Sequence, residues 1–109
     1  MVSREERVAR NEAGARDINE RIEDSYGSHR LDTYLSIVCE CGLAECDVFL
    51  RVTKSEYEDV RADPRRFIID RMHLIADVED VVAETDRFIV VEKREGEPAE
   101  VAARSDPRS

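Results

Sequence analysis

The chain has 109 residues, of which 17 are Lys or Arg and 26 are Asp or Glu, so its formal net charge at pH 7 is −9. That length favours a single domain, and the acidic balance argues against nucleic-acid binding, which depends on clustered Lys and Arg. No apolar run approaches the roughly 20 residues that cross a bilayer, and the N-terminus lacks the apolar stretch of a secretory signal. We therefore expect a soluble, cytoplasmic protein that binds neither nucleic acid nor a membrane.

The first quarter of the chain predicts one long helix, about residues 3–24. Ser3 and Glu6 match a capping box at its start. A narrow stripe of mostly apolar residues follows at spacings of three and four: Val8, Asn11, Ala15, Ile18 and Ile22. Such a stripe favours a helix that lies over a sheet, and it leaves open a homodimer in which two copies pair as a short coiled coil.

The next segment predicts a β-hairpin over about residues 33–52. Four residues of the strand at 33–40 are apolar, namely Tyr34, Leu35, Ile37 and Val38. In the strand at 47–52, Val48, Leu50 and Val52 occupy alternate positions, and Gly42 lies in the tight turn between the strands. All three cysteines of the chain lie in or beside this turn.

Short elements make up the rest of the chain. Thr53 and Glu56 form a second capping box, which predicts a helix directly after the hairpin. The further elements are expected as a helix at 54–62, a strand at 66–70, a helix at 77–85 and a strand at 88–92. Residues 94–109 predict a mobile tail with at most a frayed helical turn. The sum is one α+β domain over residues 1–93, with a long N-terminal helix on a sheet of three to four short strands, two short helices and a zinc-type cysteine turn.

The cysteines carry the clearest chemical signal, in the run CECGLAEC at residues 39–46. An odd number of cysteines in a reducing compartment is a poor disulfide framework, whereas clustered thiolates suit tetrahedral zinc. Cys39 and Cys41 are two residues apart and point to the same face of a strand, Gly42 permits a tight turn, and Cys46 returns from its far side. We predict a structural zinc site, with packed thiols or a redox pair as alternatives.

A closed zinc site needs a fourth ligand. His73 lies in the connection after the strand at 66–70, from which it can fold back onto the hairpin. His29 precedes the first strand, and ten extended residues would hold it about 30 Å from Cys39. The predicted ligands are therefore Cys39, Cys41, Cys46 and His73, and the alternatives for the fourth position are His29, a carboxylate such as Asp47, or water.

Several segments between residues 11 and 93 resemble a known family. They are the helix with Asn11-Glu12-Ala13, Arg16 and Ile18-Asn19-Glu20-Arg21-Ile22-Glu23, the Cys-x-Cys-Gly-x-x-x-Cys turn at 39–46, Glu56-Tyr57-Glu58, the distal His73, and Val90-Val91-Glu92-Lys93. This arrangement resembles a family of small uncharacterised proteins from high-GC, actinobacterial-type bacteria, in which Pro-Gly often precedes the His where this chain has Arg71-Met72. The resemblance implies a metal site and no established activity.

Three functions of different classes fit these residues. The first is a structural zinc that stabilises a thin core and a hairpin tip, where Leu43 and Ala44 contact a partner protein in a regulatory role. The second is a thiol-based redox or metal sensor that uses the same cysteines. The third is a catalytic zinc with Glu40 or Glu45 as base, which we do not expect because the chain has no phosphate loop, nucleophile elbow or HExxH helix.

Overall fold

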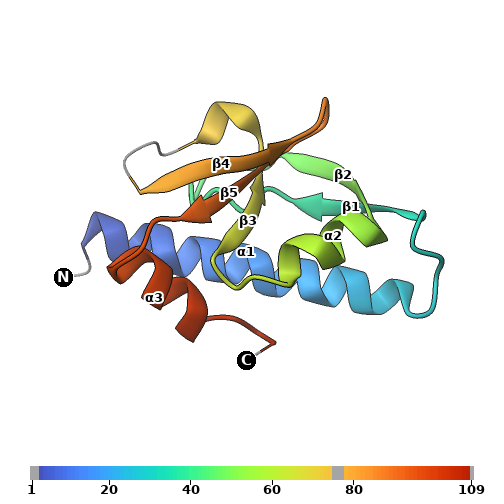
Figure 1. The fold of residues 1–109 in the computed structure, drawn as a ribbon, viewed down its shortest axis with the longest axis horizontal. Helices are drawn as coiled ribbons and strands as arrows, with labels where there is room; N and C mark the ends of the chain where they lie inside the picture. The colour runs from blue at the N-terminus through green and yellow to red at the C-terminus, as the bar shows by residue number, and fades with distance from the viewer. Residues whose placement is uncertain (1–2, 75–77, 109) are drawn as a thin grey trace.

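The long N-terminal helix runs along the molecule, and other elements pack against it (Figure 1). The computed structural model describes residues 3–74 and 78–108, and its first element is α1 (Arg4–Tyr26). The other elements are β1 (Tyr34–Val38), β2 (Phe49–Thr53), α2 (Lys54–Arg61), β3 (Arg66–Ile69), the 3₁₀ helix η1 (Arg71–His73), β4 (Glu79–Glu84), β5 (Ile89–Lys93) and α3 (Glu97–Arg104). Figure 1 shows α1 along the length of the molecule, with the strands on one side and α3 beside its N-terminal half. The expected α+β class is confirmed, and no helix among the described residues is long and apolar enough to cross a bilayer.

The predicted hairpin forms from β1 and β2. The two strands are antiparallel, with Leu35 opposite Val52 and Ile37 opposite Leu50. These four side chains face the core and are almost completely buried. The Thr53 capping box that opens α2 also forms, in both directions.

A second sheet, in the order β3-β5-β4, lies beside the hairpin. The prediction of a helix at 77–85 was wrong: residues 79–84 form β4, and residue 77 lies outside the described residues. The β-branched Val81 and Val82 suit a strand, and the free edge of β5 offers backbone partners that a short isolated helix would lack. The strands therefore form two small sheets, where the sequence predicted one.

The segment predicted as a tail contains helix α3. Ala99 and Ala102 of this helix are buried, and the Arg16 guanidinium donates to the carbonyl of Ala102 at 2.7 Å. Beyond the helix, Arg108 forms ion pairs with Glu20 and with Glu23 of α1. The prediction of a mobile tail was therefore wrong for residues 97–104. The segment has few large apolar residues, but two buried alanines and hydrogen bonds from other elements hold it in place.

The face that α1 turns toward the rest of the molecule is polar. Its buried residues are Glu12, Arg16, Asn19 and Glu23. By contrast, Ile18 of the predicted stripe is 49% exposed. The stripe prediction was therefore wrong for Ile18. The helix packs instead through charged and amide side chains, which bind charges and backbone groups of other elements.

A buried lysine anchors the N-terminal half of this helix. The ammonium of Lys93, on β5, pairs with the carboxylates of Glu12 and of Glu79, the latter at 2.8 Å. Burial raises the pKa of Glu12 to about 7, although the positive charge of Lys93 opposes that rise. The contact ties α1 to both β4 and β5.

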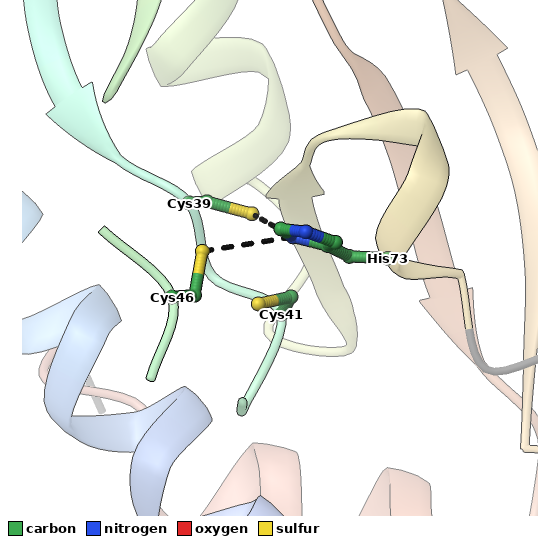
Figure 2. Close-up of side chains that lie close together, drawn as sticks. All are labelled: Cys39, Cys41, Cys46 and His73. Atoms are coloured by element: carbon green, nitrogen blue, oxygen red, sulfur yellow. Dashed lines mark hydrogen bonds between the residues drawn. The ribbon is translucent and has the colours of Figure 1, made fainter. Parts of the chain in front are cut away.

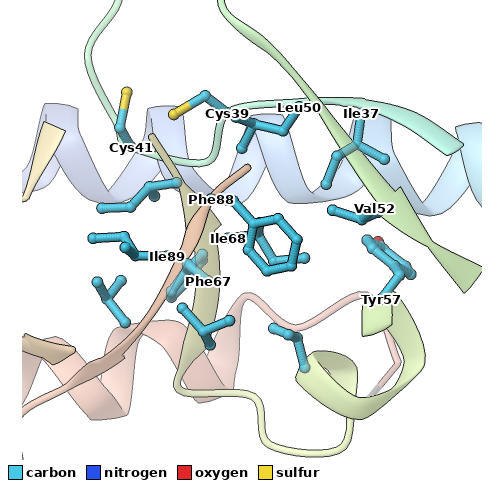
Figure 3. Packing of buried hydrophobic residues seen from close by; sticks show 14 of the residues in the cluster. Ile37, Cys39, Cys41, Leu50, Val52, Tyr57, Phe67, Ile68, Phe88 and Ile89 are labelled. Atoms are coloured by element: carbon cyan, nitrogen blue, oxygen red, sulfur yellow. The ribbon is translucent and has the colours of Figure 1, made fainter. Parts of the chain in front are cut away.

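The apolar core fills the space between the two sheets and α2 (Figure 3). Its labelled members are Ile37, Cys39, Cys41, Leu50, Val52, Tyr57, Phe67, Ile68, Phe88 and Ile89. Two of the three cysteines therefore lie at the margin of the core, which shields their sulfur atoms from bulk water.

Candidate metal centre

Four predicted ligands converge at one end of the hairpin. The sulfur atoms of Cys39, Cys41 and Cys46 and a ring nitrogen of His73 all lie within 4.8 Å of one another. Figure 2 shows the imidazole, carried by η1, facing the three cysteines of the hairpin connection. The fold thus joins residues up to 34 positions apart in the sequence, and this group could hold a metal ion.

The distances agree with tetrahedral coordination. Zinc bonds of about 2.3 Å to sulfur and about 2.05 Å to nitrogen, at the tetrahedral angle, place a sulfur and a nitrogen ligand about 3.6 Å apart. The Nδ1 atom of His73 lies 3.5 Å from the sulfur of Cys39 and 3.6 Å from that of Cys46. Two edges of the polyhedron therefore already have the length that zinc requires.

Each sulfur also faces a backbone N–H group. The amide of Asp70 donates to the sulfur of Cys39 at 3.2 Å, the amide of Leu43 donates to Cys41, and that of Val48 donates to Cys46. Such bonds favour the ionised sulfur, which is the form that binds a metal. A cluster of thiols that only packed would have no need of these donors.

The three thiols differ in acidity. A hydrogen bond from Cys39 lowers the pKa of Cys41 to about 5, against the effect of burial. The same hydrogen bond, together with burial, raises the pKa of Cys39, and burial raises that of Cys46. Cys41 is therefore the thiol that ionises most easily, and metal binding releases the protons that remain on the group.

Gly42 lets the cysteine turn lie directly against α1. Its φ is +79°, a conformation that side-chain-bearing residues rarely adopt. A Cβ atom there would lie 2.7 Å from Cγ1 of Val8 and 2.9 Å from its carbonyl oxygen. Asn11 of the same helix donates to the carbonyl of Gly42 at 3.0 Å.

Gly42→Ala should lower the free energy of unfolding by about 3 kcal/mol, the sum of the backbone strain and the steric conflict with Val8. Urea unfolding measures the change. Gly14→Ala is the matched control, because Gly14 lies within α1 with open space around it. That change should raise stability by about 0.5–1 kcal/mol. A loss at Gly42 no larger than 0.5 kcal/mol would contradict the close packing of the turn on α1.

Behind the ligands lies a buried polar contact that the sequence analysis did not assign. Both oxygens of the Glu40 carboxylate accept hydrogen bonds, from the side-chain amide of Asn19 at 2.7 Å and from the amide of Ile68 at 3.0 Å. Asn19 also pairs with the backbone N–H and carbonyl of Val38, each at 2.8 Å. The helical spacing of Glu12, Arg16, Asn19 and Glu23 was the signal that could have identified this face.

The alternative fourth ligands lie outside the group. His29 is exposed in the loop after α1, where its ring contacts Tyr26, and Asp47 is also not among the four residues that converge. A hollow of about 430 Å³ borders the group, and its lining includes Leu43, Cys46 and His73. One flank of the candidate centre therefore meets the surface, while Cys39 and Cys41 are buried on the other.

Comparison with family models, with curated protein sequences and with solved structures found no match. The geometry of the four residues therefore carries the functional assignment on its own.

Proposed function

We propose that Cys39, Cys41, Cys46 and His73 bind one structural zinc ion. The observation that carries the proposal is the pair of sulfur–nitrogen distances, 3.5 and 3.6 Å, which agree with the edge of a zinc tetrahedron. The backbone N–H groups that face the sulfurs support it. Four protein ligands leave no open position for a substrate, as in structural sites.

In our proposal the chain is a metal-stabilised interaction module. It acts in the cytoplasm and has no catalytic activity of its own. The ion holds the tip of the hairpin, where Leu43 is 45% exposed. A rigid tip with an apolar side chain suits contact with another protein, in a regulatory role. The resemblance to small actinobacterial-type proteins and the homodimer through α1 stay predictions.

Native mass spectrometry of the purified protein tests the assignment. We expect one zinc per chain in the parent and in His29→Ala, which serves as the matched histidine control. Cys41→Ser and His73→Ala should lose the ion, because each removes one of the four ligands. A parent without zinc would refute the site, and zinc retained in His73→Ala would reassign the fourth ligand.

A thiol-based sensor is the second candidate, and the exposed flank of the site favours it. Cys46 is partly exposed beside the hollow, whereas Cys39 and Cys41 are buried. Peroxide could therefore reach the sulfur of Cys46 first. Reduction of the peroxide to water takes two electrons from two thiolates, which join as a disulfide, and the ion is then released. Zinc release by low peroxide concentrations that a thiol reductant reverses would favour the sensor, and slow, irreversible release would favour the structural site.

A further inference from the structure

The docking of α1 depends on the segment that carries the metal ligands. Two polar side chains of the helix, the partly buried Asn11 and the buried Asn19, form hydrogen bonds with residues 38–42. Asn11 donates to the carbonyl of Gly42. Asn19 pairs with the backbone of Val38 and donates to the carboxylate of Glu40. Such hydrogen bonds need well-placed partners, so this part of the docking of α1 requires that residues 38–42 be held in position.

Glu40 occupies the centre of these contacts. It stands between Cys39 and Cys41 in the chain and is completely buried. One carboxylate oxygen accepts from Asn19 on α1 and the other from the amide of Ile68 on β3, while the backbone N–H of Glu40 donates to the carbonyl of Ile68 at 2.9 Å. A single side chain therefore joins the ligand segment to α1 on one side and to β3 on the other.

We propose that Glu40 couples metal occupancy to the docking of α1. This inference rests on the proposed zinc site. A metal that fixes Cys39 and Cys41 also fixes the residue between them, and with it the acceptor that Asn19 requires. Coupling between two equilibria is reciprocal, so a firmly docked α1 raises zinc affinity as much as zinc favours docking. Glu40 acts here as a positioning residue, since it contacts no metal itself in this scheme.

Glu40→Gln tests the link with little change in shape. The carboxylate accepts on both oxygens, whereas a glutamine amide has one acceptor, so either Asn19 or the amide of Ile68 must lose its partner. Loss of a group that holds the metal ligands in position typically changes metal affinity by about 10–100-fold. We expect a zinc dissociation constant raised at least about tenfold and, at saturating zinc, amide exchange in α1 accelerated at least about tenfold relative to β5.

Asn19→Ala is the second variant, because it removes the helix side of the same contact and leaves the Glu40 contact with Ile68. Two exposed residues provide matched controls. Glu45→Gln changes the other carboxylate that precedes a cysteine in the turn, and Asp17→Ala changes an exposed residue of α1. Both controls should bind zinc within about twofold of the parent, with unchanged exchange in α1.

Zinc affinity separates coupling from general destabilisation. It is measured by competition with a chromophoric chelator, and circular dichroism verifies that each variant is folded. While the native state dominates, a loss of global stability alone leaves its zinc affinity unchanged. The cobalt-substituted proteins add a second readout, since displaced thiolates shift the sulfur-to-cobalt absorption bands in Glu40→Gln and not in Glu45→Gln.

Parent-like zinc affinity in Glu40→Gln, or α1 exchange that rises no more than that of β5, would overturn the coupling. If Glu40→Gln does not fold, Asn19→Ala decides by the same two criteria. Failure of the zinc site itself appears separately, because the parent would then bind no zinc in the first titration.

Discussion

Chelation of zinc from the loaded protein should lower its free energy of unfolding by about 4 kcal/mol, if the loaded sample holds free zinc at about 1,000 times the dissociation constant. The reason is that the unfolded chain does not hold three thiolates and an imidazole in one tetrahedron, so the ion stabilises the native state alone. For a domain of this size the loss corresponds to a fall of roughly 15–30 °C in the melting temperature. Thermal unfolding with and without a chelator, under reducing conditions, measures it.

Two variants make this measurement specific. Cys41→Ser should unfold at the temperature of the chelated parent and should not respond to the chelator, since it has no ion to lose. His29→Ala should respond as the parent does, because His29 lies outside the group of four residues. An unchanged melting temperature in the chelated parent would show that the four side chains do not stabilise the fold through a metal.

Arg16→Ala should lower the free energy of unfolding by about 3–5 kcal/mol, the combined effect of lost hydrogen bonds from a charged donor and of the cavity that a large buried side chain leaves. The guanidinium is completely buried. It donates to the carbonyls of Pro64 and Ala102, each at 2.7 Å, and lies 4.6 Å from the centre of the Phe67 ring. Its loss removes a charged donor from the buried carbonyl of Ala102 and from the partly buried carbonyl of Pro64, and leaves a cavity beside an aromatic ring.

Urea unfolding at saturating zinc measures this change, and Arg21→Ala is the matched control on the same helix. Arg21 is exposed and pairs with Asp17 at 3.5 Å, a contact worth about 0.5 kcal/mol or less. Because one carbonyl belongs to Ala102, the Arg16 variant should also be cleaved faster near α3 by a protease. A loss below 1 kcal/mol for Arg16→Ala would contradict a stabilising role for the buried guanidinium.

The local features of the chain were predictable from the sequence where short-range chemistry decides them. The side chain of Ser3 caps α1 by accepting from the backbone N–H of Glu6, and the full capping box of Thr53 and Glu56 forms at α2. The alternating residues around Leu50 and Val52 form the inner face of the hairpin. In each case the signal is contained within a few residues, so no distant partner is needed to interpret it.

The candidate metal centre was predictable in part for a different reason. Three cysteines within eight residues come close in space when the chain turns between them, and Gly42 marks that turn in the sequence. The approach of His73 depends on η1 turning back toward the hairpin. The sequence favoured His73 as the fourth ligand mainly because His29 would lie too far from Cys39. Its position beside Cys39 and Cys46 is a property of the tertiary structure.

By itself the sequence determined the caps, the hairpin, the α+β class and the cysteine donors, because each depends on spacing along the chain. Only the tertiary structure decided that residues 79–84 form a strand, that α3 packs on α1, and that α1 buries Arg16 and Asn19 in place of Ile18. The physical reason is the same in all three: a polar or weakly patterned segment takes its conformation from unpaired backbone groups and charges on elements distant in sequence. Those partners exist only once the chain has folded.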